Sequence, residues 1–325
     1  MFPLPAPHAF DPHHIPADLR ALNETIRAEH AKRPDTWSVP IEEVRRARIE
    51  GKGIFPRPEP DPHAEIVEIA GRDGRAIRVR VLRPRTREAR GTFFHVHGGG
   101  WVFGSAMESD PRLRRLAEAT GLVTVSVDYR LAPEHPFPAA GDDCCEAALA
   151  VTGGGVADCP DGFFAIGGES AGAHLCAATL LRLRDDHHAQ PFRAALLVAG
   201  CYDLGLTPSV ANFGEDRLIL NSRDVSQFAS LAVPRAEARR TPENSPLCAR
   251  LHDMPPAFFS CGTADLLIDD TLFMAARWQA AGNPTQMSLT NGGCHVFEVF
   301  GTPSGEASLA RAEAFLNAEI GRGNR

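Results

Sequence analysis

Short apolar runs alternate with longer amphipathic stretches along most of the chain. Eight of these runs have the length and the β-branched or aromatic content that are typical of strands. They occupy residues 64–70, 75–84, 91–97, 121–129, 162–168, 193–200, 255–262 and 284–292. Helical periodicity fills most of the intervals, at residues 111–119, 138–151, 171–184, 267–281 and 306–319. The alternation predicts an α/β protein with an eight-stranded, mainly parallel sheet that helices cover on both faces.

A hairpin and two helices precede this alternation, and one long segment breaks it. The sequence GRDG at residues 71–74 separates the first two strands and predicts a tight hairpin, so the second strand should run antiparallel. Residues 17–32 and 40–50 are expected to form two helices ahead of a proline-rich linker. Residues 202–246 are too long for a simple crossover between strands. We expect an inserted cap element there, at about residues 204–245.

Composition and charge restrict the class of protein. The chain has 325 residues, of which 43% are hydrophobic and 23% charged, as in globular proteins with a sizeable core. Its net charge of −7 argues against nucleic acid or an anionic membrane as the main partner. No apolar run has the length of a membrane span, and the N-terminus lacks the pattern of a signal peptide. We therefore expect no stable membrane association.

The eight cysteines do not have the pattern of a disulfide framework. None belongs to a C-x-x-C pair, and Cys144 and Cys145 are adjacent on an expected helix. We expect reduced, mostly buried thiols in a cytoplasmic protein. The adjacent histidines at 13–14 and 187–188 lack a third ligand at suitable spacing, so the sequence predicts no metal site.

The sequence GESAG at residues 168–172 lies between an expected strand and an expected helix. In that setting, G-x-S-x-G forms a sharp turn that projects the serine hydroxyl into the open, and side chains two positions to either side would collide. We therefore predict that Ser170 is a nucleophile. The alternative, a glycine-rich turn without chemistry, is disfavoured by the strand–turn–helix setting.

A serine hydroxyl needs a base that removes its proton and an acid that orients the base. In such sheets both come from loops at the carboxyl ends of later strands, in the chain order serine, acid, histidine. Asp265 follows the strand at 255–262, and His295 follows the strand at 284–292. The sequence predicts a catalytic triad of Ser170, Asp265 and His295.

Four other residues have weaker claims to these roles. Asp203 follows the sixth strand and stays open as a second acid. Asp269 and Asp270 fall inside the following helix, where solvation or a helix-terminus role is expected. His174 lies one turn beyond Ser170 on its helix and points away from the hydroxyl, so we expect it to pack in the interior.

Three consecutive glycines follow the third strand, in the sequence FFHVHGGGWVFG. Acyl transfer passes through a tetrahedral oxyanion that fixed N–H groups must stabilise. Because backbone without side chains can approach that oxygen closely, we predict an oxyanion hole formed by the N–H groups of Gly99, Gly100 and Ala171. Gly98 is a weaker candidate, and His97 is expected to brace the loop rather than touch substrate.

Together these residues resemble the hormone-sensitive-lipase-like branch of the α/β-hydrolases, the bacterial family IV esterases. The matching motifs are HVHGGGWVFG, VSVDYRLAPEHPFPAA, GESAG, GTADLLIDD and CHVFEVF. The resemblance implies a serine carboxylesterase that hydrolyses short- to medium-chain esters without a cofactor. It also implies cap helices within residues 1–55 and a catalytic domain at 56–325 that carries the cap insertion. Tyr129, Arg130 and Glu134 in the second motif are expected to be structural.

The chain departs from the common family pattern in three places near the site. It has GESAGAHL at residues 168–175 where GDSAGGNL is frequent. Leu266 stands where proline often follows the catalytic aspartate, and Val296 stands where glycine often follows the histidine. None of these changes removes a predicted catalytic group, but they leave the substrate preference open.

Four aromatic residues are candidates for an apolar substrate pocket, with ordinary packing as the alternative for each: Trp101, Phe103, Phe213 and Phe297. The expected partner is a small-molecule ester. Hydrolysis of amides, carbamates or lactones by the same route stays open, whereas a non-catalytic receptor is disfavoured because all three triad residues are present. A homodimer also stays open, because dimers are common among similar proteins.

Overall fold

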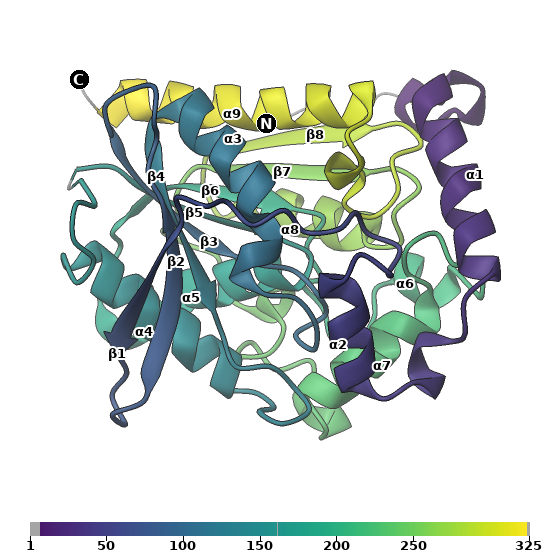
Figure 1. The fold of residues 1–325 in the computed structure, drawn as a ribbon, viewed down its shortest axis with the longest axis horizontal. Helices are drawn as coiled ribbons and strands as arrows, with labels where there is room; N and C mark the ends of the chain where they lie inside the picture. The colour runs from purple at the N-terminus through teal and green to yellow at the C-terminus, as the bar shows by residue number, and fades with distance from the viewer. Residues whose placement is uncertain (1–6, 161, 324–325) are drawn as a thin grey trace.

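The computed structural model describes residues 7–160 and 162–323 and arranges eight strands in one sheet (Figure 1). The order across the sheet is β1-β2-β4-β3-β5-β6-β7-β8. The strands are β1 (Glu65–Ala70), β2 (Ala76–Leu82), β3 (Gly91–Val96), β4 (Leu122–Asp128), β5 (Phe164–Glu169), β6 (Phe192–Val198), β7 (Ala257–Gly262) and β8 (Thr285–Thr290). The prediction of an eight-stranded sheet is confirmed.

Strand directions bring the predicted chemistry to one edge of the sheet. β2 pairs antiparallel with β1 on one side and with β4 on the other. All the other neighbours pair parallel, which confirms a mainly parallel sheet with an antiparallel second strand. Because parallel strands point the same way, the carboxyl ends of β3, β5, β7 and β8 lie along a common edge.

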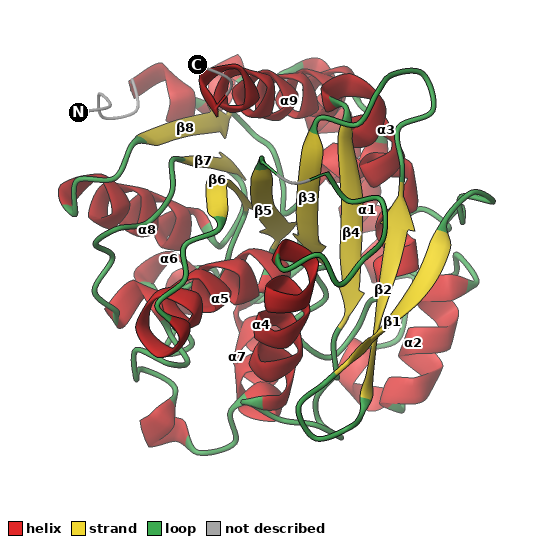
Figure 2. Cartoon of the chain, turned by 90° about the vertical axis from the view of Figure 1, so that its left-hand side faces the viewer, coloured by secondary structure: helices red, strands yellow, loops and turns green. Residues whose placement is uncertain are grey.

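Helices cover both faces of the sheet, and Figure 2 shows α4 and α5 in front of it and α3 behind. One face carries α3 (Asp110–Thr120) and α9 (Pro303–Gly323), and the other carries α4 (Ala139–Thr152), α5 (Ala171–His187) and α8 (Ile268–Ala280). Neighbouring side chains of a strand face opposite ways, so Phe93 packs with α3 and α9 while Phe94 packs on the other face. Both are buried, which explains the continuous apolar runs.

A further group of helices lies beside the sheet, at the right of Figure 1. It consists of α1 (Ala17–Ala31) and α2 (Ile41–Ile49) ahead of β1, and of α6 (Pro208–Asn212) and α7 (Ser222–Ala232) between β6 and β7. Trp37 joins the two parts, because its indole N–H donates to Asp224 at 2.8 Å and its ring meets Phe228 edge-on at 5.1 Å. Among the residues described, no helix is both long enough and apolar enough to cross a bilayer.

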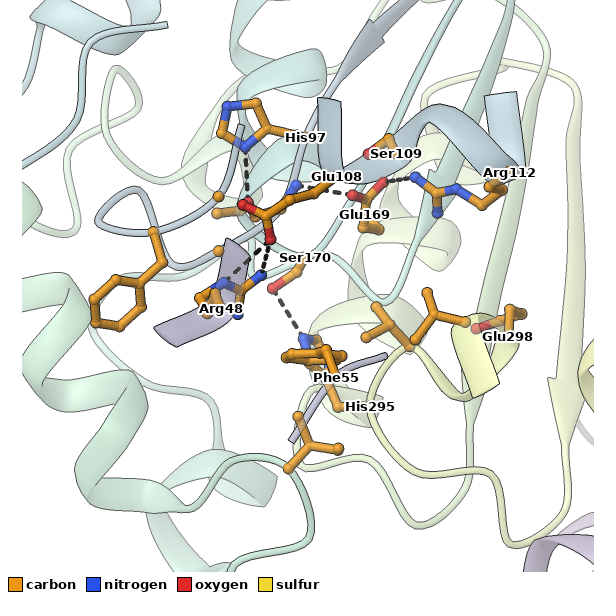
Figure 3. Close-up of a pocket in the computed structure, with 18 of the residues that line it drawn as sticks. Arg48, Phe55, His97, Glu108, Ser109, Arg112, Glu169, Ser170, His295 and Glu298 are labelled. Carbon is orange, nitrogen blue, oxygen red and sulfur yellow. Dashed lines mark hydrogen bonds and ion pairs between the residues drawn. The ribbon is translucent and has the colours of Figure 1, made fainter. Parts of the chain in front are cut away.

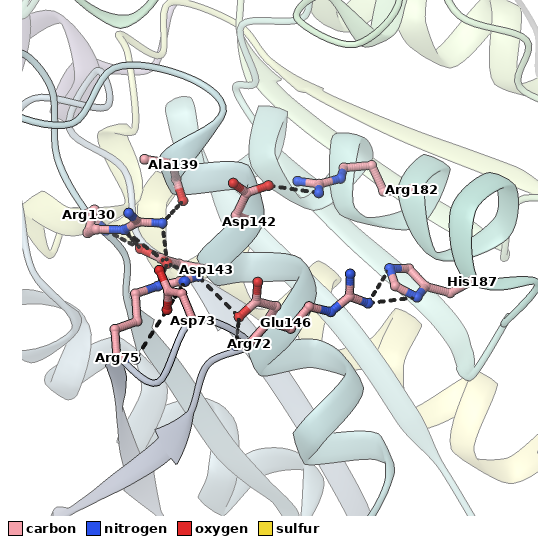
Figure 4. Close-up of polar contacts among 10 residues, drawn as sticks. All are labelled: Arg72, Asp73, Arg75, Arg130, Ala139, Asp142, Asp143, Glu146, Arg182 and His187. Atoms are coloured by element: carbon pink, nitrogen blue, oxygen red, sulfur yellow. Dashed lines mark hydrogen bonds and ion pairs between the residues drawn. The ribbon is translucent and has the colours of Figure 1, made fainter.

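Acidic residues of α4 fix the segments around that helix (Figure 4). The buried Asp143 accepts hydrogen bonds from Arg75, at the β1–β2 turn, and from Arg130, which follows β4. Asp142 pairs with Arg182 of α5 at 2.8 Å. The chain between β4 and α4 therefore follows a fixed path, as the resemblance implied for Arg130.

The cysteines form no disulfides. All eight are free, and six of them are buried. Burial raises the pKa of the Cys144 and Cys201 thiols well above the usual range, so both are protonated and unreactive at neutral pH.

Candidate active site

Ser170 lies in the sharp turn between β5 and α5. Its φ of 56° and ψ of −122° fall outside the regions that L-residues ordinarily adopt. A side-chain carbon at Gly168 or at Gly172 would collide with the carbonyl oxygen of Val96 on the neighbouring strand. The two glycines therefore permit the turn, and the Ser170 N–H secures it by donating to the Val198 carbonyl at 2.9 Å.

The structure brings the three predicted triad residues together from three strand ends. Ser170 Oγ lies 2.9 Å from His295 Nε2 (Figure 3), and His295 Nδ1 lies 2.8 Å from Asp265 Oδ2. Asp265 follows β7 and His295 follows β8, in the expected chain order. All three side chains are buried.

Asp265 decides which nitrogen of His295 carries the proton. Its Oδ1 accepts the Leu267 N–H at 2.9 Å, which leaves Oδ2 directed at the imidazole. Because a carboxylate only accepts, His295 Nδ1 donates this hydrogen bond and Nε2 keeps a lone pair toward the Ser170 hydroxyl. The arrangement can remove the serine proton and stabilise the imidazolium that results.

The other acidic candidates serve other contacts. Asp270 is fully buried, and its carboxylate accepts hydrogen bonds from the backbone N–H groups of Tyr202 and Asp203, at the start of the β6–β7 segment. Asp269 accepts the Ser209 N–H at 2.8 Å, and Asp203 pairs with Arg240 at 3.1 Å. In the described ranges none of these three is hydrogen-bonded to His295. Within the same ranges, no group of three or more metal-ligating side chains lies close enough to hold an ion.

The glycine loop after β3 leaves two N–H groups unused. Gly99 and Gly100 have φ values of 121° and 63°, which glycine adopts readily. Neither N–H donates to another group in the part of the chain that the structure describes. Ala171, as the first residue of α5, also has an N–H without a helical acceptor. All three residues line the same cavity as Ser170.

Gly98 differs from the two glycines that follow it. Its N–H donates to the Glu169 carboxylate at 2.9 Å, so it is not available to a substrate oxygen. Its carbonyl accepts a hydrogen bond from His97 Nδ1 at 2.8 Å. The Tyr129 hydroxyl donates to the His97 carbonyl at 3.0 Å, and the two rings stack 4.2 Å apart. His97 and Tyr129 therefore hold the loop, which gives the YRLAPEHPFPAA motif a structural role at the site.

A cavity of about 340 Å³ opens at Ser170. Trp101 and Phe103 lie in its wall, whereas Phe213 and Phe297 do not. Phe297 is fully buried in a cluster with residues of α1, and Phe213 packs against that cluster. The expectation that these two rings line the pocket is corrected: they anchor the N-terminal helix instead.

The cavity wall also contains residues that no sequence motif indicates. Apolar residues of the β6–β7 segment contribute to it, as do residues ahead of β1 and residues at and just before the start of α3. From the β6–β7 segment they include Ile219, Leu220, Val225 and Phe228. The others include Arg48, Phe55, Glu108 and Arg112 (Figure 3). Arg48 pairs with Glu108 at 2.9 Å and lies 4.9 Å over the Phe55 ring. The expected cap elements pointed to those of these residues that lie within 1–55 and 204–245, whereas the sequence analysis gave no signal for Glu108 or Arg112.

Val296 occupies a position that favours glycine. Its φ of 47° and ψ of 41° lie in the left-handed region, which is unusual for a β-branched residue. The residue is buried and lines the cavity beside His295. The departure from the family pattern therefore strains the backbone and adds a side chain to the pocket wall next to His295.

His174 connects the glycine loop to the β6–β7 segment. Its Nδ1 accepts the Trp101 indole N–H at 3.3 Å, and its Nε2 donates to the Asn244 carbonyl at 2.9 Å. Burial lowers the pKa of His174 to about 4, so the ring is neutral at pH 7, as both hydrogen bonds require.

We expect His174 to make the folded protein sensitive to acid. Its pKa of about 4 lies below the ordinary 6.5, so its contribution to stability is complete above pH 6.5 and is lost as the pH falls toward 4. The loss over this window amounts to about 3 kcal/mol. Urea unfolding at pH 7 and pH 4.5 should show a smaller decrease for His174→Gln than for the wild type. The same decrease in both proteins would contradict this assignment.

Comparisons with known proteins place the chain in a family. Residues 93–299 match the family model described as the α/β-hydrolase fold. The carboxylesterase NlhH of Mycobacterium tuberculosis is 34% identical over 257 residues, which cover 76% of this chain and 79% of that protein. The chain belongs to the α/β-hydrolase family.

Within this family, the chain is similar to esterases whose structures have been solved. An esterase of Pyrobaculum calidifontis has a TM-score of 0.82 and 29% identity, and the match covers 95% of this chain and 98% of the other. A hormone-sensitive lipase from a metagenome library has a TM-score of 0.80 and 25% identity, with 94% and 99% covered. The resemblance to the hormone-sensitive-lipase-like branch is confirmed.

Proposed function

We propose that this α/β-hydrolase is a serine carboxylesterase that hydrolyses short- to medium-chain esters through an acyl-enzyme. The observation that carries the proposal is the hydrogen-bonded series of Ser170, His295 and Asp265, which opens into a cavity lined by free N–H groups. The similarity to carboxylesterases supports this proposal. So does the similarity to an acetyl-hydrolase of Streptomyces hygroscopicus, which is 29% identical over 74% of this chain and 80% of its own length.

In the acylation half, Ser170 Oγ attacks the ester carbonyl carbon while His295 Nε2 takes the hydroxyl proton. The carbonyl oxygen becomes an oxyanion, which the N–H groups of Gly99, Gly100 and Ala171 stabilise. When the tetrahedral intermediate collapses, the bond to the alcohol oxygen breaks and the alcohol leaves with the proton from His295.

In the deacylation half, a water molecule repeats the attack on the acyl carbon. His295 Nε2 takes one proton from the water, and a second tetrahedral intermediate forms in the same oxyanion hole. Its collapse breaks the bond to Ser170 Oγ, which recovers the proton from His295, and the carboxylic acid leaves. Asp265 keeps Nδ1 protonated throughout, and no metal or cofactor takes part in these steps.

The helices beside the sheet act in this proposal as a cap over the site. Residues 1–55 and about 204–245 are assigned to the cap, and residues 56–325 to the catalytic domain that carries the insertion; residues 1–6, 161 and 324–325 lie outside the described ranges. Arg48 and Phe55 on one side and Phe228 on the other lie in the cavity wall, which supports this division. The eight free cysteines support a place in a reducing compartment such as the cytoplasm.

Turnover of p-nitrophenyl esters is expected to peak at about C4 to C8 acyl chains and to fall by C16, because the capped cavity is finite. The measurement is kcat/KM across the ester series, with anilides of the same acyl groups and p-nitrophenyl carbamates alongside. Equal or faster turnover of C16 esters would contradict the cap. If the protein cleaved the anilides or the carbamates in preference to the esters, its function would be amide or carbamate hydrolysis instead of ester hydrolysis.

A further inference from the structure

Glu169 places a buried carboxylate directly before the nucleophile. It is the last residue of β5, only 9% exposed, and takes no part in the acyl-transfer steps. Its Oε1 accepts the Gly98 N–H at 2.9 Å. Its Oε2 forms an ion pair with Arg112 of α3 (Figure 3) and lies 3.1 Å from His95 Nε2. One carboxylate therefore connects the glycine loop to β3, β5 and α3.

The surroundings keep this carboxylate ionised. Burial alone would raise the pKa of Glu169, but Arg112 and His95 more than offset burial and hold that pKa well below its usual range. An ionised carboxylate binds an N–H group more strongly than a neutral acceptor does. The Gly98 N–H therefore has a strong and permanent partner at neutral pH.

A negative charge at this place also needs a counterion. The Gly99 and Gly100 N–H groups, where an oxyanion would form, follow directly after Gly98. An uncompensated carboxylate so close would oppose the developing negative charge, because like charges repel strongly in a buried site. The guanidinium of Arg112 lies against Glu169 and supplies the balancing charge.

We propose that Glu169 is a positioning residue of the oxyanion hole and that Arg112 neutralises it. By holding the Gly98 N–H, the carboxylate sets the path of the backbone into Gly99 and Gly100, whose own N–H groups stay free. The inference rests on the proposed function, because a positioned oxyanion hole matters only in a reaction that forms an oxyanion.

Three variants separate positioning from charge. Glu169→Gln keeps a weaker acceptor for the Gly98 N–H, so kcat for p-nitrophenyl butyrate should fall about tenfold with KM within about twofold. Arg112→Gln leaves the carboxylate unbalanced, and kcat should fall about 100-fold. The double variant has neither charge, and its kcat should return to the level of Glu169→Gln alone. A double variant no faster than Arg112→Gln would overturn the proposal.

Hydrogen exchange tests the positioning without relying on turnover. The carboxylate protects the Gly98 N–H, so a peptide that contains this residue should exchange faster in Glu169→Leu, while peptides from the interior of α5 stay protected. If the folded wild type hydrolysed no ester, the proposed function would fail, and the exchange result would still decide the role of Glu169. Unchanged exchange would overturn that role.

The ion pair between Asp142 and Arg182 is a matched control (Figure 4). It joins α4 to α5 at 2.8 Å, and neither residue lines the cavity. Asp142→Asn, Arg182→Gln and their double variant should leave kcat and KM within about twofold of the wild type. Rescue in the Glu169–Arg112 set alone supports a charge balance at the oxyanion hole. If kcat changed in the same way in both sets of variants, the Glu169–Arg112 pair would have only an ordinary structural role.

Discussion

Replacing Ser170 by alanine is expected to lower kcat for ester hydrolysis by about 10⁵-fold or more while the protein stays folded. The serine hydroxyl is hydrogen-bonded to His295 Nε2, so its loss removes the covalent route. Only the stabilisation by the free N–H groups and by substrate binding would remain. Initial rates with p-nitrophenyl butyrate measure the loss, and urea unfolding shows that the variant is folded.

Ser105 provides the matched control for this experiment. Its hydroxyl lies in the wall of the same cavity, but its partner is Glu108 at 3.4 Å rather than an imidazole. Ser105→Ala should therefore keep kcat within about tenfold of the wild type. If Ser105→Ala lost turnover and Ser170→Ala kept it, the nucleophile would have been assigned to the wrong serine.

Replacing His295 by alanine is expected to cost about as much as replacing Ser170, since neither residue can act without the other. The double variant Ser170→Ala/His295→Ala should be no slower than either single variant. His63→Ala is a suitable control, because His63 is exposed and lies outside the cavity. Fully additive losses in the double variant would mean that the two residues act independently, contrary to a triad.

The sheet is predictable from the sequence because each parallel strand carries its own signal. A strand buried on both faces reads as a continuous apolar run, as at residues 91–97 and 255–262, whatever its neighbours are. The antiparallel β2 is predictable for another local reason, the GRDG turn. Helix ends are less well defined by local pattern: α9 runs over Pro303–Gly323, whereas residues 306–319 are expected.

The meeting of Ser170, Asp265 and His295 is predictable because it depends on topology rather than on individual contacts. Each residue follows a parallel strand, and parallel strands bring their carboxyl ends to one edge of the sheet. The sequence motifs then select one residue from each loop. The catalytic roles themselves stay predictions until the variants are measured.

Contacts between distant segments are what the sequence does not reveal. Nothing local distinguishes Phe213 and Phe297 from the aromatic residues that do line the cavity, because the difference depends on where α1 packs. Glu169 likewise reads as the variable position of G-x-S-x-G. Its partners Arg112 and His95 lie 57 and 74 residues away along the chain, so the connection emerges only in three dimensions.

Formation of a covalent intermediate on Ser170 is the central claim, and mass spectrometry tests it most directly. An organophosphate that phosphorylates activated serines would be reacted with the wild type, with Ser170→Ala and with His295→Ala, and the digested proteins would be analysed. We predict one adduct per chain on Ser170 in the wild type, none in Ser170→Ala, and much slower labelling in His295→Ala. A stoichiometric adduct on another residue, or full turnover while Ser170 stays unmodified, would contradict the proposed mechanism.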